Sequence, residues 1–164
     1  MNWFAFLAPD PGNGSNSARR DSGDAGKEPR DPEGHVRVFL PHFVRTLQDA
    51  AATFNQSATG QLHVEVNRNG NGIEAIQLRF DGCGFAFRPT GKGAIQVDRI
   101  DPGNSAAHAL LRPRLNRRGT LKCWREQQQS NGGDALRRTT DELCEHYLLH
   151  TVRSRLVSNS KTAS

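Results

Sequence analysis

The sequence predicts an α+β fold: a two-layer sandwich in which an antiparallel meander of four to five strands is covered on one face by an N-terminal and a C-terminal helix. Three observations lead to this prediction. A segment with helical periodicity comes first, short segments of alternating hydrophobicity with Gly-rich turns follow, and a second helical segment lies near the C-terminus. The length of 164 residues, 35% of them hydrophobic, suits a single domain.

The N-terminal part, residues 1–35, is predicted to be a disordered leader. From Asp10 to Gly34 the chain has no aliphatic side chain larger than Ala, so it cannot bury enough surface to offset the loss of chain entropy. For the apolar tip before this stretch we consider docking on the domain, docking on a partner, or a free end. The tip consists of Trp3, Phe4, Phe6 and Leu7. We expect a single α+β domain over residues 36–157 and a disordered tail over residues 158–164.

The first element is expected to be a helix that starts near Pro41, because the missing N–H of proline costs least at the first position of a helix. Six apolar side chains fall on one arc of the helical wheel, about 120° wide at 100° per residue. They are Phe43, Val44, Leu47, Ala50, Ala51 and Phe54. The polar residues between them occupy the rest of the wheel, so the sequence predicts an amphipathic helix.

After Gly60 the hydrophobic period changes from 3.6 to 2, which predicts strands. Four short runs follow with apolar residues at alternate positions: Leu62 to Val66, Ile76 to Phe80, Phe85 to Phe87, and Ile95 to Val97. Turns rich in Gly, Asn and Asp separate the runs, and such residues accept the positive φ of tight hairpins. The pattern predicts a meander of four antiparallel strands with one apolar and one polar face.

A second helix is expected near the C-terminus. Thr139 with Glu142 three residues later has the pattern of a capping box, and apolar residues then recur every four positions, at Cys144, Leu148, Val152 and Leu156. The segment between the strands and this helix, residues 105–133, is the hardest to interpret. We expect one or two helical turns over Ser105–Leu111 and a fifth, edge strand over Leu121–Arg125.

The positive charge is concentrated in the last third of the chain. The net charge is −2 over residues 1–35, +1 over residues 36–104 and +6 over residues 105–164, which sum to +5. An anionic partner is therefore expected to bind the C-terminal third. Of the 22 basic residues 18 are Arg. Arg suits bidentate phosphate contacts, although GC-rich codon usage of the bacterial type is the simpler explanation of the bias.

The segment Arg112–Arg125 is the strongest candidate for a binding site. It holds six cations and no acidic residue, together with Trp124. Cations beside an aromatic ring are typical of surfaces that contact phosphates and stack on an unpaired base. If Leu121 and Cys123 point into the core, Lys122 and Trp124 share the outer face. The alternative is a solvated basic loop whose Trp packs on the domain. The predicted polyanion-binding residues are Arg112, Arg114, Arg117, Arg118, Lys122, Trp124 and Arg125.

The sequence offers weaker candidates elsewhere, and no catalytic residue, metal site or cofactor is predicted. The outward face of the four-strand meander carries charges of both signs, which disfavours the sheet itself as a phosphate platform. His146 and His150 have the i, i+4 spacing of a zinc-binding helix, but a third ligand is missing and an exposed location is the simpler interpretation. Cys83 lies in a predicted turn without an assignable base or cation to activate it.

The remaining features favour a cytoplasmic protein that does not bind membranes. The three cysteines are odd in number and contain no CxxC pair, no basic residue precedes the apolar N-terminal tip, and no run approaches the roughly 18 apolar residues of a membrane span.

Two functional hypotheses follow. The first is a small non-enzymatic binding module that engages nucleic acid or another polyanion through the basic segment, with an affinity that falls steeply with salt. The alternative is a protein-interaction module, regulatory or chaperone-like, that uses an exposed sheet edge and the apolar tip. An enzyme centred on Cys83 or on the histidines is the least favoured class.

Overall fold

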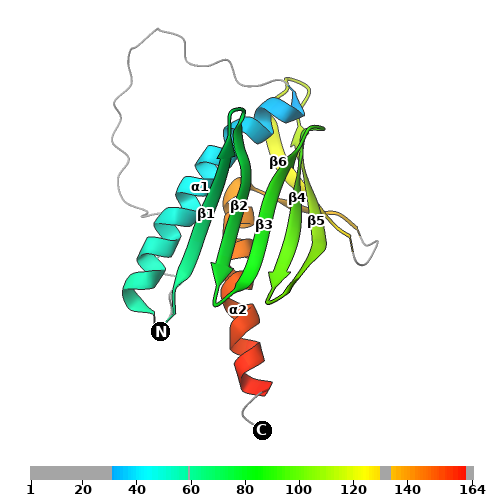
Figure 1. Ribbon diagram of the computed structural model, residues 1–164. Coiled ribbons are helices and arrows are strands. Elements are labelled where there is room, and N and C mark those ends of the chain that lie inside the picture. The colour runs from blue at the N-terminus through cyan, green and yellow to red at the C-terminus, as the bar shows by residue number, and fades with distance from the viewer. Residues whose placement is uncertain (1–30, 59, 130–133, 162–164) are drawn as a thin grey trace, which may run out of the picture.

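The computed structural model describes residues 31–58, 60–129 and 134–161, with side chains described up to residue 153. The chain forms a helix, seven strands and a second helix (Figure 1). All seven strands belong to one antiparallel sheet in chain order. The predicted α+β class with a helix at each end is confirmed, but the sheet has seven strands where four to five were expected. The predicted leader with its apolar tip, up to residue 30, lies outside the described residues.

Helix α1 (Pro32–Ser57) begins earlier than predicted. Its N-cap is Asp31, whose Oδ1 accepts a hydrogen bond from the backbone N–H of Gly34 at 2.7 Å, and Pro32 takes the first helical position. Pro41, the predicted start, lies inside the helix on an exposed side. The helix continues through Pro41 because one buried apolar stripe runs past it: Val36, Phe39, Leu40, Phe43, Val44, Leu47 and Ala51.

The first four strands lie where the alternating pattern predicts them, and three more follow. The strands are β1 (Leu62–Asn69), β2 (Gly72–Phe80), β3 (Cys83–Thr90), β4 (Ala94–Asp101), β5 (Asn104–Leu115), β6 (Leu121–Gln128) and β7 (Leu136–Arg138). The expectation of helical turns over Ser105–Leu111 is wrong, because this stretch is a strand paired with β4 at every residue except His108, which lies at a register shift. Pairing with a neighbouring strand outweighs the helix propensity of its Ala and Leu residues.

Strand β6 contains the predicted fifth strand, but it does not form the edge of the sheet. Its residues 124–126 pair with β7, so β1 and β7 are the two edge strands of the described sheet. Sequence periodicity offers little help with β7, because three residues are too few to show an alternation.

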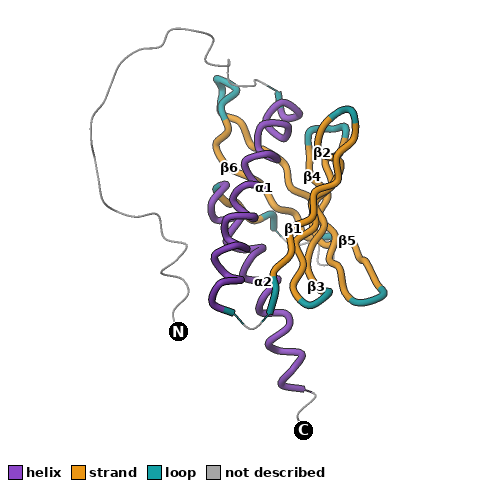
Figure 2. The backbone as a smooth tube through the Cα atoms, turned by 60° about the vertical axis from the view of Figure 1, so that its left-hand side comes forward, coloured by secondary structure: helices purple, strands orange, loops and turns teal. Residues whose placement is uncertain are grey.

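Both helices pack on the same face of the sheet, as Figure 2 shows for α1 and α2 beside β1 to β5. Helix α2 (Thr140–Lys161) starts with the predicted capping box. The backbone N–H of Thr139 donates to the Glu142 carboxylate at 2.7 Å, and the N–H of Glu142 donates to Oγ1 of Thr139 at 3.2 Å. The helix continues to Lys161, into the stretch expected to be a disordered tail. The sheet face opposite the helices is called the outer face below.

The core between the two layers contains side chains from both helices and from β1 to β6. Its largest fully buried members are Trp124, Tyr147, Phe43 and Phe87. Among the helices that the structure describes, none is both long enough and apolar enough to span a membrane.

Candidate nucleic-acid interface

The predicted basic segment forms the end of the β5–β6 hairpin. Strand β4 pairs with β5 only as far as Leu111, whereas β5 and β6 pair with each other up to Leu115 and Leu121. The hairpin therefore extends beyond β4, with β7 paired to it at Trp124 and Arg125 and only two strands nearer the turn. We call residues 112–125 the basic ribbon. Its turn lies next to the first turn of α1 (Figure 1).

The turn of the basic ribbon is held by the side chain and backbone of Asn116. Its Oδ1 accepts hydrogen bonds from the backbone N–H groups of Arg118 at 2.8 Å and Thr120 at 3.0 Å. Its own N–H donates to the Thr120 carbonyl at 2.9 Å, and Gly119, at φ 81°, donates to the Asn116 carbonyl at 3.0 Å. These bonds fix the backbone from which Arg117 and Arg118 project into solvent.

Helix α1 braces the inner side of the basic ribbon. The Nε2–H of His35, a buried side chain, donates to the Gly119 carbonyl at 2.7 Å. One turn further along, the rings of Phe39 and Trp124 are in contact, with centroids 4.3 Å apart. The ribbon is therefore attached to the core on one face and free on the other.

Three arginines lie side by side on that free face. Arg112 of β5 pairs directly with Arg125 of β6, and Arg125 pairs directly with Arg137 of β7. Directly paired residues of an antiparallel sheet point to the same face, with Cβ atoms about 4.5–5.5 Å apart. All three side chains are exposed. We call Arg112, Arg125 and Arg137 the arginine row.

The cations around the arginine row extend it into a patch. Arg114 lies two residues along β5 from Arg112 and therefore on the same face, opposite Cys123. Lys122 is exposed at a β-bulge in β6, and Arg117 and Arg118 are exposed in the turn. Six of the seven predicted binding residues, all except Trp124, thus lie at one corner of the molecule.

The charges of this patch have no acidic partners among the described residues. None of its seven cations forms an ion pair or a side-chain hydrogen bond there. The opposite half of the outer face differs, because Arg88 forms an ion pair with the buried carboxylate of Asp98, which also accepts from Gln96 at 3.2 Å. The mixed charge noted in the sequence therefore belongs to β1–β4, whereas the seven cations of the β5–β7 patch have no ion pair with a described acidic residue.

The expectation that Trp124 shares the outer face with Lys122 is wrong. Trp124 is fully buried, and its indole N–H donates to Oγ1 of Thr140 at 3.2 Å. The reason is the bulge between Leu121 and Cys123, which leaves Lys122 without a paired partner. A bulge shifts the alternation by one residue. Leu121 and Trp124 therefore both face the core, although strict alternation would place residues three positions apart on opposite faces.

Sequence reasoning missed Arg137, the third member of the row. The doublet Arg137-Arg138 could have indicated it, because two neighbouring residues of a strand point to opposite faces and one of the two must face outward. Without evidence for a strand at this position, the doublet has no assignable direction. In the structure Arg137 is exposed on the outer face, whereas Arg138 turns to the core face and meets Glu126.

A buried polar cluster lies on the core side of the same strands. The carboxylate of Glu126, which is fully buried, accepts hydrogen bonds from Nε of Arg138 at 2.7 Å and from the hydroxyl of Tyr147 at 2.8 Å. Nε2 of His146 lies 3.8 Å from Glu126, and its ring centroid is 4.4 Å from that of His150. His146 is thus half-buried against the cluster and does not lie on a fully solvated face.

The electrostatics of the cluster follow from this geometry. Burial alone would raise the pKa of the Glu126 carboxyl, but the hydrogen bonds from Arg138 and Tyr147 hold that pKa below its ordinary value. Burial and the Arg138 charge lower the pKa of His146 to about 4, against the opposing effect of Glu126. Burial also lowers the pKa values of His108 and His150. At neutral pH the cluster therefore holds one carboxylate, one guanidinium and neutral imidazoles.

This arrangement predicts a loss of stability in mild acid that depends on His146. Its pKa is 6.5 in the unfolded chain and about 4 in the folded protein, so the unfolded state binds more protons between these values and stability falls as the pH falls. Between pH 7 and pH 5 this one group should lower the free energy of unfolding by about 2 kcal/mol. Urea unfolding of the wild type and of His146→Gln at both pH values measures the difference.

The other two histidines of the cluster contribute a background pH dependence to this measurement. His108 and His150 have lowered pKa values as well and act in the same direction in both proteins, so a remaining pH dependence in His146→Gln is expected. The assignment to His146 is wrong if wild type and variant lose the same free energy between pH 7 and pH 5.

The described residues contain no cluster of metal-ligating side chains, and burial disfavours the thiolate of Cys144. They contain no group of three or more His, Cys, Asp or Glu side chains placed to hold a metal ion. The three cysteines are free thiols, and Cys144 is buried, which raises the pKa of its thiol to about 12. Cys83 is half-buried at the start of β3.

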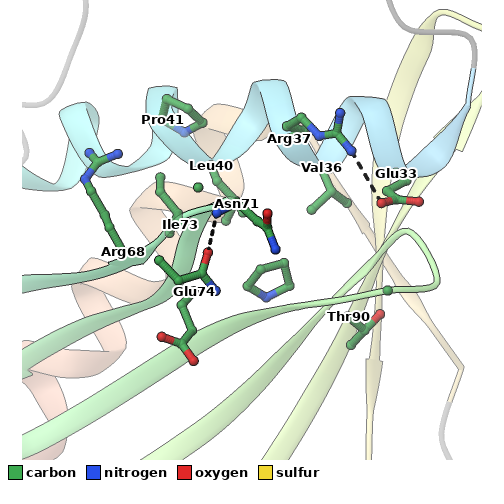
Figure 3. A pocket seen from close by; sticks show the side chains of 14 residues that line it. Glu33, Val36, Arg37, Leu40, Pro41, Arg68, Asn71, Ile73, Glu74 and Thr90 are labelled. Atoms are coloured by element: carbon green, nitrogen blue, oxygen red, sulfur yellow. Dashed lines mark hydrogen bonds and ion pairs between the residues drawn. The ribbon is translucent and has the colours of Figure 1, made fainter.

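A cleft of about 760 Å³ lies between α1 and the β1–β2 and β3–β4 turns (Figure 3). Val36, Leu40 and Ile73 supply apolar side chains to its lining, and charged groups of both signs surround them. Two of these, Arg37 and Glu33, form an ion pair at 3.5 Å. The lining contains no Ser, Cys, His or Lys, so the cleft offers no Ser–His or Cys–His pair.

Comparison with known proteins adds no relative: no family model matches the chain, and neither a curated protein nor a solved structure resembles it at a significant level.

Proposed function

We propose that this protein is a non-enzymatic module that binds the phosphate backbone of nucleic acid through the arginine row and the basic ribbon. The single observation that carries this proposal is the direct cross-strand pairing of Arg112 with Arg125 and of Arg125 with Arg137, without an acidic partner among the described residues. A planar guanidinium donates two parallel hydrogen bonds to a phosphate.

The energetics of the sheet support this assignment. Like charges directly opposite each other on neighbouring strands destabilise a sheet. The row contains two such pairs in succession on one exposed face, whereas Arg88 in the same sheet has a carboxylate partner. These like-charge pairs weaken the fold when nothing is bound. Binding of a polyanion neutralises them, which accounts for their presence on one face. The rigid turn and the contacts with α1 hold the cations in place before binding.

A protein-interaction module is the second candidate, and the cleft between α1 and the hairpin turns favours it. Apolar side chains inside and charges of both signs at the rim are typical of a groove that takes a peptide segment. This role predicts a partner whose binding does not require the arginine row.

The proposal is tested by replacing the row and measuring DNA binding. In Arg112→Gln/Arg125→Gln/Arg137→Gln, three phosphate contacts are lost, so the affinity for labelled duplex DNA should fall roughly 100-fold at about 0.1 M salt. The slope of log affinity against log salt should become shallower by up to about three. Fluorescence anisotropy across a salt series measures both quantities.

A matched control separates local contacts from net charge. Arg45, Arg68 and Arg153 are exposed on α1, β1 and α2, and their triple replacement by Gln changes the net charge equally. It should weaken binding only a few-fold. The proposed site is refuted if this control loses as much affinity as the row variant, and the proposed function is refuted if the wild type binds no nucleic acid at low salt.

A further inference from the structure

We infer that the arginine row binds double-helical nucleic acid in preference to single strands, and that it does so independently of base sequence. This inference rests on the proposed function and names the substrate class of the same site. It departs from the expectation that the sequence alone suggests, in which Trp124 stacks on an unpaired base.

No exposed aromatic side chain of the described residues is available for base stacking. Binding of single strands without sequence preference relies on aromatic side chains on which successive bases stack. All eight aromatic side chains that the structure describes belong to the core or pack against it. Trp124, the aromatic residue within the basic ribbon, is fully buried under Phe39. The described part of the outer face can therefore contact phosphates but offers no aromatic surface to an unpaired base.

The charge density and strand spacing of a duplex match the arginine row. A duplex carries one charge per about 1.7 Å of axis, twice the density of each of its strands, so a surface that binds only phosphates gains more from a duplex. The arginine row crosses two interstrand gaps and therefore spans about 10 Å, comparable with the groove widths of about 6 and 12 Å in B-form DNA. Arginines at the two ends of the row can thus contact phosphates on both strands, which a single strand does not offer.

The arginine row is placed to contact phosphates and not the edges of bases. A two-stranded ribbon reads bases by entering the major groove, but the inner face of the basic ribbon is occupied by α1 through the His35–Gly119 hydrogen bond and the Phe39–Trp124 contact. The arginine row itself lies on the surface of a sheet and cannot reach base edges in the manner of an inserted element. Phosphate contacts alone carry no sequence information.

The test compares four labelled probes of about 20 nucleotides or base pairs: single-stranded DNA, the matching DNA duplex, a duplex of shuffled sequence, and an RNA duplex, at about 50 to 200 mM salt. The full-length protein should bind at least one duplex type about tenfold or more tighter than the single strand. The two DNA duplexes should agree within about twofold. The row variant should lose most of the difference between duplex and single strand.

The possible failures are distinct. Equal or tighter binding of the single strand overturns the duplex preference, and a tenfold difference between the two DNA duplexes overturns the independence of sequence. In both cases the protein still binds nucleic acid and the proposed function stands. If no probe binds at the lowest salt, the proposed function itself is refuted. Where the duplexes bind, the ratio of the affinities for the DNA and RNA duplexes identifies which double helix the surface prefers.

Discussion

Replacement of Arg138 by Met is expected to lower the free energy of unfolding by about 3 to 5 kcal/mol. Arg138 donates through Nε to the fully buried carboxylate of Glu126, and its side chain is itself only 22% exposed. Met fills much of the volume of the aliphatic part of Arg138. The Glu126 carboxylate keeps its hydrogen bond from the Tyr147 hydroxyl but loses its cationic partner. An uncompensated buried charge is among the most costly defects in a folded protein. Guanidinium chloride unfolding at pH 7 measures the effect.

The neighbouring residue provides the control for this prediction. Arg137→Met removes the same side chain one position earlier, but Arg137 is exposed on the outer face. It should change the free energy of unfolding by less than about 0.5 kcal/mol. Loss of the like charge opposite Arg125 acts in the stabilising direction. Equal effects of the two variants would contradict the assignment of Arg138 to the core face.

Two further outcomes separate charge from packing. Glu126→Gln/Arg138→Met leaves no unpaired carboxylate in this cluster and should recover a large part of the lost stability. In Arg138→Met alone, the pKa of Glu126 rises above its unfolded value because its main stabilising partner is gone. The stability deficit of that variant relative to wild type is then smallest at low pH and grows as the pH rises. A deficit that is the same at pH 5 and pH 8 would point to packing.

The part of the fold that the sequence predicts is the part whose signal is local. Strands β1 to β4 have apolar residues at alternate positions in their central parts and are separated by turns with Gly at positive φ, at Gly72, Gly82 and Gly93. The capping box of α2 needs only Thr139 and Glu142, and both of its hydrogen bonds are present. These features depend on residues within a few positions of one another, so they can be predicted from the sequence alone.

The features that could not be predicted depend on pairing between distant segments. The run from Ser105 to Leu111 has the composition of a helix and becomes a strand because β4 lies beside it. Strict alternation predicts that Trp124 faces outward, but the bulge at Lys122 interrupts the alternation. The arginine row requires the register of three strands, and the position of Arg137 in β7 is set by its partner Arg125. The cationic composition was visible in the sequence, but its alignment was not.

The start of α1 shows a local signal assigned to the wrong residue. Proline at the first helical position was the correct rule, but it applies to Pro32 behind the N-cap Asp31, not to Pro41. Interior proline removes one hydrogen bond and is normally costly. It is tolerated here on the exposed side of a helix whose buried stripe includes Phe39 and Phe43 on either side of it.

The burial of Trp124 leads to a second large effect. Trp124→Ala is expected to lower the free energy of unfolding by about 3 to 5 kcal/mol, because it removes a fully buried ring that contacts Phe39 and leaves a cavity beneath the basic ribbon. Trp124→Phe keeps a ring at that position and loses the hydrogen bond to Thr140, at a cost of about 1 kcal/mol. Thermal or denaturant unfolding of the two variants gives both values.

Binding measurements on the same residue decide between packing and stacking. Because the indole does not reach the surface, Trp124→Phe should bind nucleic acid with unchanged affinity while its stability falls. Lys122→Ala should show the reverse: this exposed residue affects unfolding by less than about 0.5 kcal/mol, but its loss removes a phosphate contact and weakens binding several-fold. A tenfold loss of affinity in a folded Trp124→Phe protein would contradict this prediction, because a buried indole cannot contact the ligand.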